Sequence, residues 1–220
     1  MTPASPAKRP LCSACLRPLS TCICQWITPV EHAVEVVILQ HPLEVTNAKG
    51  SARLLHLSLP NSRLVTGDVF EVAALQAWLT QPPRRAILLY PDTPSDQSPD
   101  LSPPPVLSPD DLRDPAGLRL IVLDGTWRKS RKMLYQNPLL QQLPRLALRD
   151  LPPSHYLIRK AHLPDQLSTL EATCAALMQL DGGVLQFQPL LTAFDGFVAQ
   201  QMGYRKFQQV RSFTPTNLID

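Results

Sequence analysis

The stretch LRLIVLDGTWRKSRK (118–132) decides how the chain around it folds. Its first seven residues are a nearly continuous apolar run, which is typical of a parallel β-strand covered on both faces. The run ends at Asp124, turns through Gly125 and continues into a segment with helical periodicity that stops before Pro138. A strand followed at once by a helix predicts one unit of an α/β domain with a mainly parallel sheet.

Similar units lie on both sides of this stretch. Near-continuous apolar runs predict further strands, and apolar residues at helical spacing predict the helices between them. Strands are expected within 32–41, 84–91 and 143–150, and helices within 47–59, 71–79, 126–137, 165–183 and from about 189 to 207. This alternation strengthens the prediction of an α/β domain.

The length and composition allow one large domain with a small appendage. The chain has 220 residues, of which 44 % are hydrophobic, within the ordinary range for globular proteins. Residues 1–10 are expected to be a disordered start, 11–30 a cysteine-rich module, and 31–212 the main domain. Within that domain, residues 91–115 hold eight prolines and six aspartates, which predicts an exposed insertion loop.

The sequence also indicates the cellular compartment and argues against some classes of nucleotide-binding site. No apolar run approaches the roughly 20 residues that a membrane-spanning helix needs, and residues 1–10 lack the apolar centre of a secretory signal. We therefore expect a cytoplasmic protein that does not associate with a membrane and whose cysteines stay reduced. Only 8 glycines are present and no G-x-G-x-x-G occurs, which argues against a P-loop or a Rossmann cofactor site.

Four of the five cysteines lie close together in the segment CSACLRPLSTCIC. Cys12, Cys15, Cys22 and Cys24 have the spacing C-x₂-C-x₆-C-x-C, and four thiolates suit a closed tetrahedral zinc site that stabilises a small segment. The alternatives are four unrelated thiols, or a redox pair of Cys12 and Cys15, which would leave the other two unexplained. Cys174 lies on a helical apolar stripe and is expected to be an inert core residue.

Asp124 is the first candidate for catalysis. It ends a buried strand, and in open α/β sheets ligands gather beyond the carboxyl ends of the strands. The alternative is that Asp124 or Thr126 only caps the following helix.

The helix after Asp124 is strongly basic. Arg128, Arg131 and Lys132 recur at helical spacing on one face, where like charges repel one another. A polyanion such as an RNA backbone would relieve this repulsion, whereas the alternative is a solvated basic face. Two further cationic pairs are candidates to extend the surface, namely Arg159-Lys160 and Arg205-Lys206.

Other polar residues stand at predicted element ends. Ser168 and Glu171 form the capping-box pattern S-x-x-E, and with Thr169 they could also offer a helix N-terminus to a ligand. Further candidates are His41 and His155 as bases, and Tyr156 and Arg159 as nucleotide contacts. Each has the alternative of a purely structural or solvated role.

These motifs together resemble one known family. The cysteine cluster, HPLE (41–44), LDGTW (123–127), SHYLIR (154–159) and LSTLEA (167–172) occur in the order seen in DTW-domain proteins. The resemblance covers most of the chain, from about Cys12 to Phe207. It departs at 91–115, which looks longer and less regular than the family core requires.

The resemblance implies a tRNA-uridine aminocarboxypropyltransferase. Such an enzyme transfers the 3-amino-3-carboxypropyl arm of S-adenosylmethionine to N3 of a uridine in tRNA and releases methylthioadenosine. It also implies a SPOUT-like fold with a knot near the C-terminus, and cofactor-side roles for Tyr90, Thr126, Trp127, Tyr156, Ser168, Thr169 and Glu171. Trp127 has the alternative of a core residue.

Under this resemblance Asp124 is hypothesised to take the N3 proton, while the basic helix grips tRNA phosphates. Two alternatives stay open: an RNA methyltransferase on the same fold, and a zinc-ribbon RNA-binding scaffold without catalysis. SPOUT-like enzymes often dimerise, but no interface can be named from this sequence.

Overall fold

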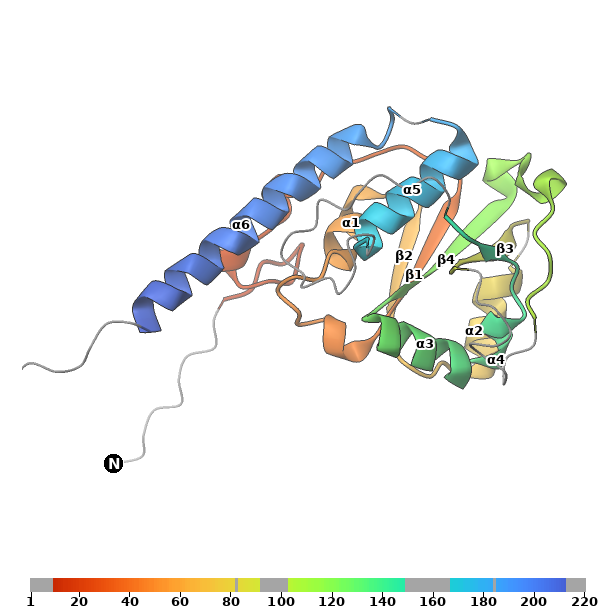
Figure 1. Ribbon diagram of the computed structural model, residues 1–220, viewed down its shortest axis with the longest axis horizontal. Coiled ribbons are helices and arrows are strands. Elements are labelled where there is room, and N and C mark those ends of the chain that lie inside the picture. Colours follow the sequence, from red (N-terminus) through yellow and green to blue (C-terminus); the bar gives the residue numbers. More distant parts are fainter. Residues whose placement is uncertain (1–9, 82, 92–102, 149–166, 184, 213–220) are drawn as a thin grey trace, which may run out of the picture.

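The computed structural model describes residues 10–81, 83–91, 103–148, 167–183 and 185–212. A sheet of five parallel strands in the order β2-β1-β4-β3-β5 forms its centre (Figure 1). The strands are β1 Glu35–Gln40, β2 Ser62–Thr66, β3 Arg85–Leu89, β4 Leu118–Asp124 and β5 Arg145–Leu146. The predicted α/β class with a mainly parallel sheet is therefore confirmed.

Helices connect the strands. They are α1 Ala52–Ser58, α2 Val72–Thr80, α3 Trp127–Gln136, α4 Pro138–Gln141, α5 Thr169–Asp181 and α6 Gln188–Ser212, and short 3₁₀ turns cover Leu19–Thr21, Cys24–Trp26, Pro42–Glu44, Pro109–Leu112 and Pro115–Gly117. The helix expected from residue 47 begins only at Ala52, because residues 47–50 form a turn closed by the bond from the Gly50 amide to the Asn47 carbonyl (2.9 Å).

The sheet is covered on both faces. α1, α5 and α6 lie on one side, and α2, α3 and α4 lie on the other (Figure 1). Alternate residues of the central strands enter the two cores: Ile38 and Leu120 face the first, whereas Val37 and Ile121 face the second. The near-continuous apolar runs in the sequence are explained by this burial on both sides.

The cysteine-rich segment packs on α6, although the two are far apart in the sequence. The Trp26 Nε1–H donates to Gln200 Oε1 at 2.6 Å, and the Tyr204 hydroxyl donates to the carbonyl of Ser20 at 2.7 Å. The Trp26 ring lies directly against Gly196, where a Cβ atom would collide with it. The cysteine-rich segment therefore packs directly against α6, and the absence of a side chain at Gly196 makes room for the Trp26 ring.

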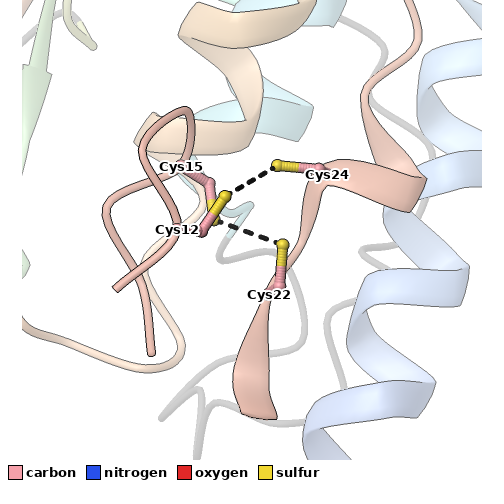
Figure 2. A group of neighbouring side chains, drawn as sticks. All are labelled: Cys12, Cys15, Cys22 and Cys24. Carbon is pink, nitrogen blue, oxygen red and sulfur yellow. Dashed lines mark hydrogen bonds between the residues drawn. The ribbon is translucent and has the colours of Figure 1, made fainter. Parts of the chain in front are cut away.

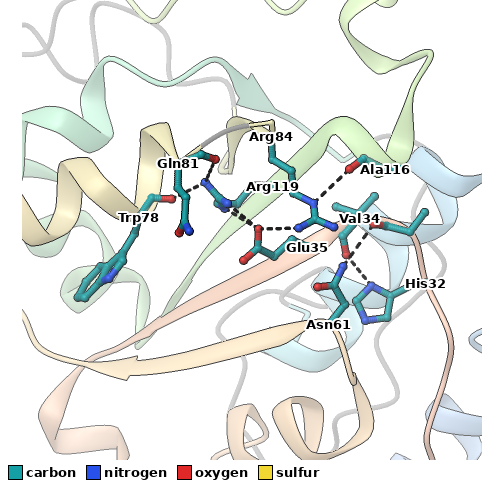
Figure 3. Close-up of polar contacts among 10 residues, drawn as sticks. His32, Val34, Glu35, Asn61, Trp78, Gln81, Arg84, Ala116 and Arg119 are labelled. Atoms are coloured by element: carbon teal, nitrogen blue, oxygen red, sulfur yellow. Dashed lines mark hydrogen bonds and ion pairs between the residues drawn. The ribbon is translucent and has the colours of Figure 1, made fainter.

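A partly buried ion network lies at the amino end of the sheet (Figure 3). Glu35 Oε2 accepts from Arg119 Nε at 2.8 Å and from Arg84 Nη1 at 3.4 Å. Arg119 also donates to the carbonyls of Trp78 (2.7 Å) and Gln81 (3.2 Å), at the end of α2. The buried guanidinium of Arg119 is thus paired with a carboxylate, and the network lies at the opposite end of the strands from Asp124.

Part of the proline-rich insertion packs against the domain. In its described part, Leu107 and Leu112 contact the core, and Asp111 pairs with Arg85. Residues 92–102 lie outside the described residues, as do residues 1–9 of the disordered start expected at 1–10. So does 149–166, the connection between β5 and α5, and the expected C-terminal knot is not shown.

None of the helices in the described part of the chain combines the length and apolarity needed to cross a membrane.

Candidate active site

Asp124 is held between two other segments at the carboxyl end of β4. Its side chain is buried, with 5 % exposure of the residue. Gln40, its register partner on β1, donates from Nε2 to Asp124 Oδ2 at 2.9 Å, and the Thr169 hydroxyl donates to Oδ1 at 2.7 Å. Hydrogen bonds to both oxygens fix the orientation of the carboxylate. Thr126, not Asp124, is the N-cap of α3, with its Oγ1 accepting from the Lys129 amide at 3.4 Å.

A small pocket opens beside Asp124. One wall is the turn between β1 and α1, and the other is the N-terminus of α5. The lining residues are Glu44, Asn47, Lys49, Gly50, Ser51, Asp124, Gly125, Ser168 and Thr169. The pocket therefore offers carboxylates, an ammonium group and hydroxyls within one confined space, as expected at a carboxyl edge of an α/β sheet.

Glu44 is fixed within this pocket wall by two donors. Lys129 Nζ lies 2.7 Å from Glu44 Oε1, and Asn47 Nδ2 donates to Oε2 at 2.6 Å. Lys129 thus turns from the basic helix toward the pocket, whereas the preceding Arg128 is exposed. A buried carboxylate with a charged partner is stable in this position.

The predicted capping box at the start of α5 is confirmed. The Glu171 amide donates to Ser168 Oγ at 3.2 Å, and the Ser168 amide donates to Glu171 Oε2 at 2.8 Å. The carboxylate of Glu171 is therefore engaged with the helix end, and it does not line the pocket. Of the described residues expected on the cofactor side, Ser168 and Thr169 line the pocket beside Asp124.

Tyr90 and Trp127 form an aromatic stack near the same edge of the sheet. Their ring centroids are 5.2 Å apart with an angle of 20° between the planes. Tyr90 is buried, which raises the pKa of its hydroxyl, and the guanidinium of Arg145 lies 5.3 Å from its ring centroid. Trp127 is 53 % exposed. The alternative that Trp127 is a core residue is therefore wrong.

The basic face of α3 is exposed. Arg128, Arg131 and Lys132 point away from the core, while Ser130, Met133 and Leu134 are buried. Arg131 lies over the Tyr135 ring, with its guanidinium carbon 5.7 Å from the centroid, and the hydrogen bond to the Tyr135 hydroxyl raises the pKa of Arg131.

The remaining predicted residues fall elsewhere. His155, Tyr156, Arg159 and Lys160 lie outside the described residues. Arg205 and Lys206 belong to α6, but their side chains are outside the described part. His41 is buried, and its Nδ1 accepts from the Leu43 amide at 3.2 Å, which is a capping role.

The four clustered cysteines converge as the spacing predicts (Figure 2). Their Sγ atoms all lie within 4.8 Å of one another. Cys12 and Cys24 are 3.5 Å apart and Cys15 and Cys22 are 3.7 Å apart, so no disulfide joins them. A zinc–sulfur length of about 2.3 Å gives a tetrahedron with edges of about 3.8 Å. The cluster therefore fits one tetrahedral metal ion.

The thiols of this cluster differ in acidity. Amide N–H groups of Cys15 and Ala14 lower the pKa of Cys12 to about 6, whereas burial and the neighbouring thiols raise the pKa of Cys24 to about 12. Because metal ligands must be deprotonated, a metal ion would displace protons from this cluster. Cys174 is different: it is fully buried, and burial raises its pKa to about 12, which confirms the expected inert core position.

Several residues that line the pocket, or that contact its lining, were not predicted from the sequence. Gln40 had a readable signal, since it is a polar residue that ends an otherwise apolar strand. The remaining residues had no recognisable sequence signal, because they lie in a turn or on a helix face whose orientation depends on packing. They are Glu44, Asn47, Lys49, Ser51 and Lys129.

Comparisons with known proteins identify the family of this chain. The DTW domain family matches residues 9–202. A Drosophila melanogaster protein named tRNA-uridine aminocarboxypropyltransferase 2 is 32 % identical over 79 % of this chain and 68 % of its own length. Proteins of the same name from Macaca fascicularis and Mus musculus are 28 % and 26 % identical, and the chain spans only 59 % and 57 % of their lengths.

No solved structure matches this chain. The family match extends from the cysteine cluster, through the strand that carries Asp124, to the helix on which the N-terminal segment is seated. The chain belongs to the DTW domain family.

Proposed function

We propose that this protein is a tRNA-uridine aminocarboxypropyltransferase that uses S-adenosylmethionine as donor and N3 of a uridine in tRNA as acceptor. The observation that carries the proposal is the buried carboxylate of Asp124, hydrogen-bonded at both oxygens and facing a small pocket, in a member of the DTW domain family. The names of the relatives supply the substrate class.

The pocket suits the amino acid arm of the donor. That arm carries an ammonium group and a carboxylate, and the lining offers the carboxylates of Glu44 and Asp124 together with Lys49 and the hydroxyls of Ser168 and Thr169. The exposed Trp127 ring beside the pocket edge provides a flat surface for an adenine or a uracil. The Tyr90 ring stacks on the Trp127 ring. Tyr156 remains a proposed cofactor contact.

Asp124 has the role of base. Uridine N3 is a weak acid and a poor nucleophile while it keeps its proton, so a carboxylate that accepts this proton assists attack. The bond from N3 to Cγ of the donor forms as the Cγ–sulfur bond breaks, the electron pair goes to sulfur, and methylthioadenosine leaves. The hydrogen bonds from Gln40 and Thr169 keep the carboxylate oriented for this transfer.

The exposed cations of α3 are proposed to bind the tRNA backbone. Phosphate contacts position a nucleic acid without reading its sequence, and α3 begins three residues after Asp124. Arg128, Arg131 and Lys132 would thus hold the polymer while the adjacent acid acts on one base. Arg159, Lys160, Arg205 and Lys206 remain candidates to extend this surface.

The cysteine cluster is proposed to hold structural zinc. Four thiolates complete a tetrahedral shell and leave no open coordination position, so the ion would stabilise the fold and take no part in the chemistry.

The reaction can be tested directly. Purified protein is incubated with S-adenosylmethionine and unmodified tRNA, the RNA is digested, and the nucleosides are weighed. A uridine heavier by one aminocarboxypropyl group, formed together with methylthioadenosine, is the expected result. A methylated nucleoside with S-adenosylhomocysteine would contradict the proposal, as would an unchanged tRNA that nevertheless binds tightly.

A further inference from the structure

Arg17 physically joins the cysteine cluster to the pocket beside Asp124. Its guanidinium donates from Nη1 to the carbonyl of Ala48 at 2.7 Å and from Nη2 to the carbonyl of Gly50 at 2.9 Å. The same group lies over the buried ring of Phe197 on α6, 5.3 Å from the centroid. The Arg17 side chain therefore contacts two segments that are far apart in the sequence, the turn before α1 and helix α6, and joins both to the cysteine segment.

The position of Arg17 is set by the cysteine turn. The Cys12 amide donates to the carbonyl of Arg17 at 2.8 Å, and the Leu16 amide donates to the carbonyl of Cys12 at 2.9 Å. Leu16 has φ of 59°, a left-handed conformation that costs energy in a residue other than glycine. These hydrogen bonds close the turn that carries Arg17, which lies between Cys15 and Cys22. The turn directs the Arg17 guanidinium toward the pocket wall.

The two carbonyls that accept from Arg17 belong to the 47–51 turn, which forms that pocket wall, although Ala48 itself does not line the pocket. Asn47, Lys49, Gly50 and Ser51 line the pocket, and they lie in the turn before α1 rather than in a regular element. On the opposite side of the pocket, the Leu170 amide of α5 donates to Ser51 Oγ at 3.3 Å. The turn is thus tied to α5 at one end and to the cysteine segment at the other.

We infer that Arg17 is a positioning residue for the donor pocket: it holds the 47–51 turn in the shape that lines the pocket, without touching the reacting atoms. Charged donors form the stronger class of hydrogen bond, and the planar fork of arginine can serve two carbonyls at once. This inference rests on the proposed function only for its kinetic consequence, because the positioning of the turn can be measured without any substrate.

Hydrogen exchange of the backbone amides is the first measurement. The Asn47, Lys49 and Gly50 amides are all hydrogen-bonded within the turn, so they report on its order. In Arg17→Ala, exchange of the peptide covering 44–51 is expected to rise about tenfold, which is within the range of remote coupling effects. The peptide covering β4 should be unchanged. The control is Arg113→Ala, whose arginine makes an exposed ion pair with Asp110.

Kinetics supply the second readout. Arg17→Ala is expected to raise KM for S-adenosylmethionine about tenfold while kcat at saturation changes little, because the chemistry groups stay in place. Arg17→Lys keeps the charge but not the fork, so an intermediate KM is expected. If Arg17→Ala fails to fold, Arg17→Lys carries both measurements.

The outcomes separate this inference from the proposed function. Unchanged exchange at 44–51 together with an unchanged KM would overturn the role of Arg17. A rise in exchange in a protein whose wild-type form binds no S-adenosylmethionine would support the role of Arg17 and contradict the proposed function alone.

Discussion

Replacing Asp124 by asparagine removes the proposed base while preserving the shape of the side chain. The asparagine oxygen can still accept from the Thr169 hydroxyl, which lies 2.7 Å from Oδ1 in the native protein. The new amide N–H₂ would face the Gln40 amide at the other oxygen, and Gln40 can present its own oxygen by rotating its amide group. The site should therefore keep its geometry and lose its negative charge.

The expected effects on rate and on stability differ greatly in size. A positioned general base contributes about 10²- to 10⁴-fold to a rate, which is about 3–5 kcal/mol of transition-state stabilisation. Exchanging a charged for a neutral hydrogen-bond acceptor costs about 1 kcal/mol of stability, and for a domain of this size that lowers Tm by about 2–4 °C. A strong loss of activity with nearly native stability is therefore the expected signature.

Single-turnover release of methylthioadenosine, with excess enzyme over tRNA, measures the chemical step. Binding of tRNA is followed separately by filter retention, and Asp110→Asn serves as a matched control because Asp110 forms only an exposed ion pair. Asp124→Asn should slow the step at least 10²-fold with tRNA affinity nearly unchanged. A rate within threefold of wild type, or an equal loss of tRNA binding, would refute the assignment of Asp124 as base.

Three further perturbations test the other assignments. Arg131→Ala combined with Lys132→Ala should weaken tRNA binding and reduce the slope of log K against log salt by about 2; an identical slope would remove α3 from the RNA surface. Cys22→Ser should lose bound zinc, measured by elemental analysis, and lower Tm, and chelator should do the same to the wild type; full stability in chelator would refute a structural metal. Gly196→Ala should cost about 1–3 kcal/mol, because the indole packed there leaves no room for a methyl group. Gly203→Ala, with open space at the same helix, should be neutral or stabilising, and equal melting temperatures for these two variants would contradict the packing.

Sequence reasoning succeeded wherever the signal was local. The parallel strands were readable because burial on both faces requires apolar runs, and the capping box because its two residues lie three positions apart. Strand β2 was missed because it is an edge strand with no fully buried residue, so no apolar run marks it. The start of α1 was placed too early because the turn before it reads like a helix beginning.

The sequence by itself determined the α/β class, the cysteine cluster, the buried acid that ends β4 and the basic face of the helix that follows. Each depends on residues that are close in the chain, so spacing and periodicity report it. Only the tertiary structure decided what surrounds that acid. Gln40 and Thr169 reach Asp124 across 84 and 45 residues, and Arg17 reaches the pocket wall across 31 and 33. Such contacts form because packing of the two cores brings distant segments together, and side-chain direction at a turn or a helix end depends on that packing.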